Sequence, residues 1–204
     1  LLATGEPLDI LVNNAGALFN PRQLSAEGLE KSFALLLLSP WLLTERLQPL
    51  LAKAQSARVV NVLSGGMYSQ RIDVDDLHSR NGRYSGSVAY ARAKRGLMIL
   101  TEEWAEKWRS NGIVVNAMHP GWADTPGVES SLPAFYRSTR AALRSPEEGA
   151  DTIEHMVFHD DETIDMIAEA GTWMTPTLLH RTDHAIGTRK DQGTSQFVLN
   201  KMKA

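Results

Sequence analysis

The sequence has no cysteine, no long apolar run and little net charge, and each absence narrows the possible functions. Without cysteine among its 204 residues, the chain can form no disulfide and no thiolate metal site, which favours a cytoplasmic protein. Apolar runs such as Ala34–Leu38 are far too short to span a bilayer. A formal net charge of -3 provides no basic surface of the kind that binds nucleic acid.

The first residues also lack the features of a secretion signal or of a translation start. Leu1-Leu2-Ala3 has neither the positive charge nor the apolar region of a secretion signal, and no methionine begins the chain. We therefore expect the chain to be part of a longer protein. With 43% hydrophobic residues, its length suits one globular domain, or one domain and a fragment of another.

Apolar runs and helical periodicity alternate along the first two thirds of the sequence. The apolar runs predict buried strands at Leu8–Val12, Arg58–Leu63 and Ile113–Met118. Apolar residues at helical spacing predict helices at Ser25–Leu51, with Ser25 as the cap, and at Val88–Arg109. Strands that alternate with helices predict an α/β fold, in which a parallel sheet has helices packed on its faces.

The character of the chain changes near residue 150. Ser145-Pro146 followed by two glutamates predicts the start of a helix. A second short helix is predicted at residues 160–170 and an edge or irregular strand at 172–179. The residues from 182 onward are mainly polar, so we expect a short mixed segment at the C-terminus.

The segment Tyr90-Ala91-Arg92-Ala93-Lys94 places a phenol and an ammonium one helical turn apart. A nearby cation favours the phenolate, so Tyr90 could donate or accept a proton near neutral pH. The same spacing is also typical of a half-exposed tyrosine beside a solvated lysine.

Each predicted strand ends in a distinctive peptide. These peptides are Asn13–Gly16, Ser64–Gly66 and Pro120–Trp122. In open parallel sheets, ligands bind outside the carboxyl ends of the strands, so the three peptides are expected at one shared edge. Taken singly, each could equally be an ordinary turn.

Together and in this order, the motifs resemble those of the short-chain dehydrogenase/reductase superfamily, over about residues 8–152. The resemblance implies a partial Rossmann-like domain at residues 1–149. It also implies an NAD(P)-dependent oxidoreductase that interconverts a small-molecule carbonyl and alcohol by hydride transfer. Tyr90 would be the general acid or base, and Ser64 would hydrogen-bond the same substrate oxygen. Lys94 would lower the pKa of Tyr90 and hold the nicotinamide ribose.

The resemblance further implies a binding site for NAD or NADP and no metal. Its cofactor contacts would be Asn13, Asn14, Ala15, Gly16, Tyr90, Lys94, Pro120, Gly121, Trp122 and Thr125. The backbone of the first four would approach the adenosine ribose, and the turn after the third strand would flank the nicotinamide.

Two departures from the family pattern limit this expectation. No Gly-x-x-x-Gly-x-Gly turn, which would receive the pyrophosphate, lies ahead of Leu8. Leu36 occupies the position where the family often has an asparagine of a proton relay. A missing first half would leave a sheet edge and apolar faces uncovered, which predicts self-association.

Residues 150–204 resemble part of a metal-dependent amidohydrolase, with His155 at the position of a metal ligand. A hydrolytic metal site needs three or more convergent ligands, and His159, His180 and His184 do not supply the family pattern. An ordinary histidine in a helix is therefore the favoured interpretation of His155. The alternatives to an oxidoreductase are an amidohydrolase fragment and a non-catalytic remnant.

Overall fold

A computed structural model describes residues 2–151, 153–154 and 174–175, and in it three parallel strands form the main sheet. The strands are β1 (Ile10–Asn13), β2 (Ala57–Val62) and β3 (Ile113–Met118), in the order β1-β2-β3. Ile10 pairs with Arg58, and Ala57 pairs with Ile113. The α/β fold class with a parallel, Rossmann-like sheet is thereby confirmed.

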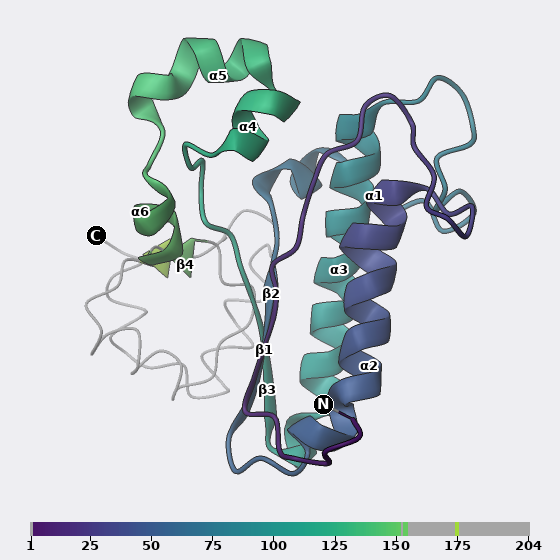
Figure 1. Ribbon diagram of the computed structural model, residues 1–204, viewed down its shortest axis with the longest axis vertical. Helices are drawn as coiled ribbons and strands as arrows, with labels where there is room; N and C mark the ends of the chain where they lie inside the picture. The colour runs from purple at the N-terminus through teal and green to yellow at the C-terminus, as the bar shows by residue number, and fades with distance from the viewer. Residues whose placement is uncertain (1, 152, 155–173, 176–204) are drawn as a thin grey trace, which may run out of the picture.

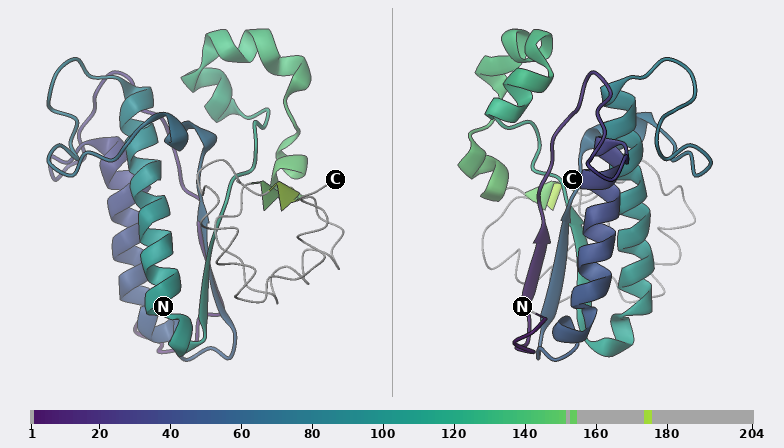
Figure 2. Two further views of the ribbon diagram at one scale, coloured as in Figure 1. Left: turned by 180° about the vertical axis from the view of Figure 1, so that it is seen from behind. Right: turned by 45° about the vertical axis from the view of Figure 1, so that its right-hand side comes forward.

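Two long helices pack side by side on one face of this sheet (Figures 1 and 2). The first helical stretch consists of α1 (Lys31–Phe33), a π-helical segment (Ala34–Leu38) and α2 (Ser39–Leu51). The second is α3 (Gly86–Lys107), followed by a 3₁₀ turn at Arg109–Asn111. The sequence predicted helices packed against the sheet, and in the structure α1, α2 and α3 cover one face together.

The first helix begins six residues later than predicted, because Ser25 belongs to a turn. Gly28 adopts a positive φ of 78°, and the backbone of Leu24 pairs with that of Glu30. The cap is the buried Glu30 carboxylate, which accepts hydrogen bonds from the backbone N–H groups of Ser32 and Phe33 at 2.9 and 2.8 Å. The longer Glu30 side chain thus caps the helix, a role that short Ser or Asp side chains usually have.

A buried tryptophan joins the two long helices. The indole of Trp104 is 2% exposed, and its Nε1 donates a hydrogen bond to Glu45 Oε1 on α2 at 2.8 Å. Trp108 stacks on Trp104 with ring centroids 5.6 Å apart. Because burying an aromatic ring of this size removes a large apolar area from water, this pair contributes strongly to the packing of α2 against α3.

A chain of polar side chains crosses the core beneath the site. The Asn13 amide donates hydrogen bonds to Thr44 Oγ1 at 3.0 Å and to Asn61 Oδ1 at 2.7 Å. The Asn61 amide donates in turn to Thr101 Oγ1 at 2.8 Å. Buried polar groups are stable only when they are hydrogen-bonded, so this chain fixes the ends of β1 and β2 relative to α2 and α3.

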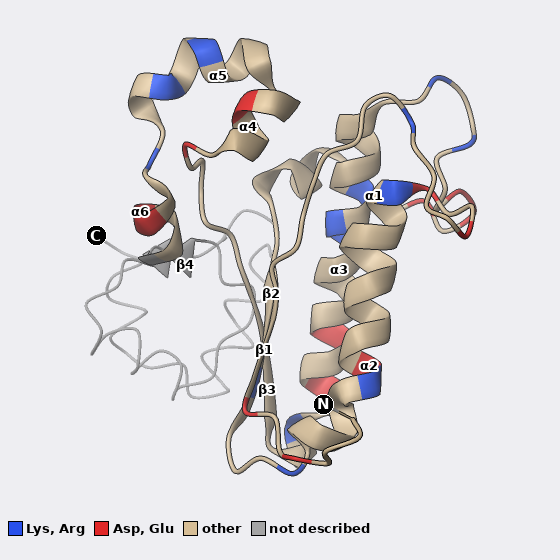
Figure 3. Cartoon of the chain, viewed as in Figure 1, with Lys and Arg blue, Asp and Glu red and all other residues tan. Residues whose placement is uncertain are grey.

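β1 is an edge strand with an apolar outer side. Ile10 is 60% exposed and Val12 is 52% exposed, while Leu11 between them is buried. This is the surface on which the predicted self-association depends, and self-association itself stays a prediction. Charged residues of both signs are interspersed along the helices and loops (Figure 3). No helix in the described part of the chain is long and apolar enough to cross a membrane.

Short helices follow β3 beyond the carboxyl ends of the strands (Figure 1). They are α4 (Pro126–Ser131), α5 (Pro133–Thr139), a 3₁₀ turn (Arg140–Ala142) and α6 (Pro146–Asp151). As predicted, Ser145 caps α6: its Oγ accepts a hydrogen bond from the Glu148 backbone N–H at 3.1 Å.

The C-terminal segment is described only in part. Two short parallel strands, β4 (Ile153–Glu154) and β5 (Met174–Thr175), form a separate two-stranded sheet. His155, the helix predicted at residues 160–170 and the polar end of the chain lie outside the described residues. The domain boundary predicted at residues 149 and 150 stays a prediction.

Candidate active site

The structure brings Ser64 and Tyr90 together at the carboxyl end of β2. Ser64 caps the 3₁₀ segment Gly65–Ser69, and its Oγ accepts a hydrogen bond from the Gly66 N–H at 3.3 Å. Tyr90 lies in the first turns of α3, and its phenol is hydrogen-bonded to the Ser64 side chain. The two hydroxyls that the sequence assigned to one substrate oxygen are therefore direct neighbours.

Lys94 lies one turn further along α3 and is directed toward the sheet. The residue is only 2% exposed, and its Nζ donates a hydrogen bond of 2.5 Å to the Val62 carbonyl. The same Nζ lies 6.0 Å from the centroid of the Tyr90 ring. The ammonium thus contacts the ring face and the last carbonyl of β2.

The expected effect of Lys94 on the Tyr90 pKa is not observed in this structure. Burial raises the pKa of the Tyr90 phenol above its ordinary value, and the hydrogen bond with Ser64 opposes this only in part. Burial also lowers the pKa of Lys94 to about 8, since the charged form is desolvated. Tyr90 therefore keeps its proton at neutral pH, which equips it to act as a general acid.

The lowered pKa of Lys94 predicts a pH-dependent stability. Above pH 10.5 the lysine is neutral in both states, and between pH 10.5 and 8 only the unfolded state gains the proton. The folded state thus loses stability as the pH falls through this window, by on the order of 3 kcal/mol, and nothing further below pH 8. We expect urea unfolding from pH 7 to 10.5 to show this change for the wild type and not for Lys94→Met.

Lys107→Met is the matched control, because Lys107 lies on the same helix with its side chain 58% exposed. Its unfolding curve against pH should run parallel to that of the wild type. Parallel curves for the wild type and Lys94→Met would contradict the prediction.

The loop after β1 approaches Lys94 through its glycine. A Cβ added to Gly16 would lie 4.0 Å from Lys94 Nζ and 3.5 Å from Leu36 Cδ2. Asn14, Ala15 and Gly16 are exposed, whereas the Asn13 side chain is committed to the hydrogen bonds in the core. Of the four residues predicted to approach a cofactor, Asn13 can therefore do so only through its backbone.

Leu36 forms an apolar wall beside Gly16. It is fully buried and lies in the π-helical segment Ala34–Leu38. π-Helical turns are often found at functional sites, where the local widening re-aims a side chain. The leucine cannot accept or donate a hydrogen bond through its side chain, so it cannot perform the relay role of the asparagine that the resemblance expects here.

The turn after β3 lies at the same carboxyl edge of the sheet as the Ser64 turn. Gly121 has a positive φ of 76°, which only glycine adopts without strain, and Pro120 precedes it. The exposed indole of Trp122 packs against Phe135 of α5 with ring centroids 4.5 Å apart. Thr125 caps α4 by accepting a hydrogen bond from the Val128 N–H at 3.3 Å. Two of the four predicted contacts from this turn, Trp122 and Thr125, are therefore tied to the helices that follow it.

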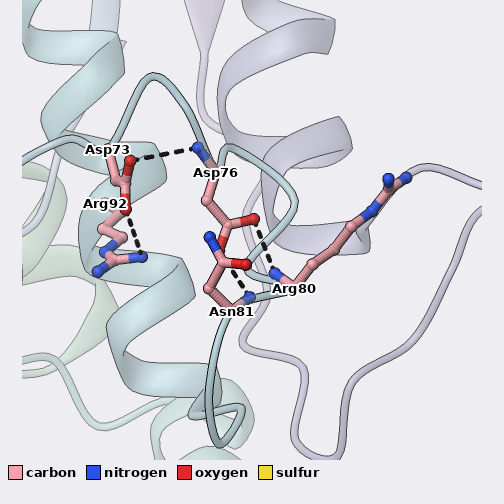
Figure 4. Close-up of polar contacts among 5 residues, drawn as sticks. All are labelled: Asp73, Asp76, Arg80, Asn81 and Arg92. Atoms are coloured by element: carbon pink, nitrogen blue, oxygen red, sulfur yellow. Dashed lines mark hydrogen bonds and ion pairs between the residues drawn. The ribbon is translucent and has the colours of Figure 1, made fainter.

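A polar network anchors the loop that leads into α3 (Figure 4). The Asp76 carboxylate accepts hydrogen bonds from the backbone N–H groups of Arg80 and Asn81 at 2.8 and 2.9 Å, which lowers the pKa of this carboxyl. Asp73 accepts from the Asp76 N–H at 3.2 Å and lies 3.8 Å from the Arg92 guanidinium. Because Arg92 is two residues beyond Tyr90, the network helps to fix the start of α3.

Sequence reasoning missed the supports of this helix. No motif in the sequence assigned a role to Asp73, Asp76 or Gly86. A Cβ at Gly86 would lie 2.4 Å from the Phe19 carbonyl oxygen, so the helix start touches the loop after β1. The ion pair of Asp73 with Arg92 and the contact of Gly86 with Phe19 leave no local signal, because each joins residues that are distant in the sequence.

The described residues fit one half of a nicotinamide dinucleotide. Lys94 and the open approach at Gly16 suit a ribose, and Tyr90 beside Ser64 suits the reacting oxygen of a substrate. The printed sequence contains no glycine-rich turn that would hold the pyrophosphate. The described part of the chain also contains no cluster of three or more residues that could bind a metal.

Comparison with known proteins places this geometry in a family context. The short chain dehydrogenase family matches residues 2–134. Dehydrogenase/reductase SDR family member 12 of Bos taurus is 44% identical over 146 residues, which are 72% of this chain and 45% of that protein. Human retinol dehydrogenase 12 is 34% identical, over 76% of this chain and 49% of that protein.

Solved structures agree on the fold. A crystal structure of an uncharacterised protein from Mycobacterium paratuberculosis superposes with a TM-score of 0.53 at 29% identity, over 70% of this chain and 53% of that one. A short-chain dehydrogenase from Sphingobium yanoikuyae in complex with NADPH has a TM-score of 0.56 at 17% identity, over 91% of this chain and 64% of that one. The chain spans about half the length of the curated relatives it matches. Since the family match covers residues 2–134 of 204, the chain belongs to the short-chain dehydrogenase family.

Proposed function

We propose that the chain carries the catalytic portion of an NAD(P)-dependent oxidoreductase that interconverts a carbonyl and an alcohol. The observation that carries the proposal is the hydrogen bond between Ser64 and a partly buried, protonated Tyr90, with Lys94 one turn away. A strongly perturbed titratable cluster at the ligand-binding edge of a parallel sheet is the arrangement expected of a catalytic site.

In the reducing direction, Tyr90 donates its proton to the carbonyl oxygen of the substrate. Ser64 shares a hydrogen bond with the phenol and holds the same oxygen in line with it. Lys94 contributes positive charge below the ring and offers its ammonium to ribose hydroxyls. A nicotinamide held at this edge would supply the hydride. Burial of the phenol and the lysine keeps water away from the proton transfer.

Cofactor binding tests the proposal directly. We expect titration with NADH and NADPH to give a saturable change in nucleotide fluorescence with at least one of the two. Gly16→Val should weaken this binding, because a branched side chain would fill the space between Leu36 and Lys94. Ala26→Val is the matched control, since Ala26 is exposed in the turn before α1.

Absence of saturable binding by either nucleotide would overturn the proposal for this chain. Where binding occurs, oxidation of the reduced nucleotide with retinal as the carbonyl substrate measures turnover. Retinal is a reasonable first probe because several relatives, 31 to 34% identical, are named retinol dehydrogenases.

A hydrolase centred on His155 remains the alternative from the sequence. His155 lies outside the described residues, and no observation on the described residues favours that function over the oxidoreductase.

A further inference from the structure

His119 lies between the two turns that form the candidate site. It follows the last residue of β3 and is buried, with 7% of its surface exposed. Its Nδ1 accepts a hydrogen bond from the Gly121 N–H at 2.9 Å. An acceptor nitrogen carries no proton, so the neutral ring has its proton on Nε2.

The other edge of the ring packs against the serine turn. A Cβ added to Gly65 would lie 2.8 Å from His119 Nε2 and 3.3 Å from Cδ2, closer than real side-chain contacts allow. The φ of Gly65 is not positive, so the backbone conformation does not require glycine here. The absence of a side chain at residue 65 is therefore needed to let the imidazole approach the residue next to Ser64.

The His119 ring lies where the backbone hydrogen bonding between β2 and β3 ends. The last backbone hydrogen bond between the two strand ends runs from the Leu63 N–H to the Met118 carbonyl at 2.8 Å. Beyond it the chains diverge into the Ser64–Gly66 turn and the Pro120–Gly121 turn. His119 touches both, through a backbone hydrogen bond on one side and a close backbone contact on the other.

We infer that His119 is a positioning residue that sets the separation between the Ser64–Gly66 turn and the Pro120–Gly121 turn. For catalysis the inference rests on the proposed function, since it fixes Ser64 relative to the wall that would flank the nicotinamide. We assign His119 a positioning role, because its Nδ1 is engaged by the Gly121 N–H and its Nε2 edge lies close to Gly65.

Two substitutions separate the hydrogen bond from the bulk of the ring. In His119→Asn the amide oxygen can replace Nδ1 as the acceptor for Gly121, whereas His119→Leu fills the space without an acceptor. We expect amide hydrogen exchange at Gly121 to be accelerated at least about tenfold by the leucine and much less by the asparagine. Backbone resonances of Ser64, Gly65 and Gly66 should shift in both variants, because the ring edge is lost.

A double-mutant cycle tests the contact with Gly65 independently of any cofactor. Gly65→Ala should lower the Tm in the wild-type background and lower it far less in His119→Asn, where the atom at the Nε2 position is gone. Equal losses of Tm in both backgrounds, or unchanged exchange at Gly121 in His119→Leu, would overturn the inference.

Turnover adds a readout that a merely structural role would not change. Per folded molecule, His119→Leu should lower kcat roughly 10- to 100-fold with little change in nucleotide affinity, and His119→Asn should recover most of the loss. His78→Leu is the control, since His78 Nδ1 also accepts a backbone N–H, from Glu30 at 3.3 Å, in another loop. Unchanged kcat in His119→Leu would refute positioning. If the wild type does not bind the nucleotide, the proposed function fails. Amide exchange at Gly121 and the double-mutant cycle with Gly65→Ala still test the positioning role of His119.

Discussion

Tyr90→Phe is expected to lower kcat/KM roughly 10²- to 10⁴-fold while the affinity for the nicotinamide nucleotide stays close to that of the wild type. The substitution removes one oxygen atom and leaves the ring that packs against the Lys94 ammonium. Without the phenol, the substrate oxygen has no proton donor, and Ser64 loses its hydrogen-bond partner. Steady-state kinetics and a fluorescence titration on the same protein separate the two effects.

Tyr84→Phe is the matched control for this substitution. The Tyr84 hydroxyl lies within hydrogen-bonding distance of two acceptors, the Phe19 carbonyl at 3.0 Å and Glu30 Oε1 at 2.9 Å. Its removal should reduce stability and leave turnover per folded molecule unchanged. Retention of wild-type turnover by Tyr90→Phe would exclude Tyr90 as the proton donor.

A second measurement bears on Tyr90 in the absence of any substrate. With ¹³C-labelled tyrosine, the Tyr90 resonance should titrate above the ordinary pKa of a tyrosine, since burial raises the pKa of this phenol. A pKa at or below the ordinary value in the free chain would contradict the effect of burial on this phenol that the structure indicates.

Gly86→Ala is expected to produce a large loss of stability, at least about 1–3 kcal/mol in the free energy of unfolding. The new methyl group would lie 2.4 Å from the Phe19 carbonyl oxygen and 2.9 Å from Asn20 Cβ. Both obstacles belong to or lie next to the backbone of the loop after β1, so they cannot simply rotate away. Either α3 or the loop has to move, and α3 carries Tyr90 and Lys94.

Two other helical glycines provide graded controls. At Gly96 the nearest obstacle is the flexible end of Leu37, with Cδ2 at 2.7 Å, so Gly96→Ala should cost less. At Gly127 the nearest atom is Thr125 Oγ1 at 3.7 Å, and alanine there should be neutral or stabilising, since alanine is favoured over glycine in a helix. Urea midpoints that do not follow this order would contradict the packing argument.

Local patterns in the sequence were sufficient to identify the strands. The runs at Arg58–Leu63 and Ile113–Met118 agree with β2 and β3 to within one residue, because continuous β-branched residues favour buried parallel strands. The first helix was predicted to begin at Ser25 because a serine cap is a strong local signal. That prediction was wrong, because the chain turns at Gly28 and the helix is capped by the carboxylate of Glu30.

The identity and the order of a few residues along the chain were sufficient to predict the family and the candidate chemistry. Ser64, Tyr90 and Lys94 are recognisable because each belongs to a short local motif, and the motifs occur in the order typical of the family. The family match over residues 2–134 confirms that part of the reasoning. The roles of the individual residues remain predictions for the experiments above.

The protonation states and the supports of the site were decided by tertiary structure alone. Sequence spacing implied that Lys94 would lower the pKa of Tyr90, yet burial raises that pKa and lowers the pKa of the lysine to about 8. Desolvation depends on every element packed around a group, so no local pattern can predict it. In the same way, the need for glycine at residues 65 and 86 comes from His119 and Phe19. Both partners are distant in sequence and become neighbours only when the sheet and helices are assembled.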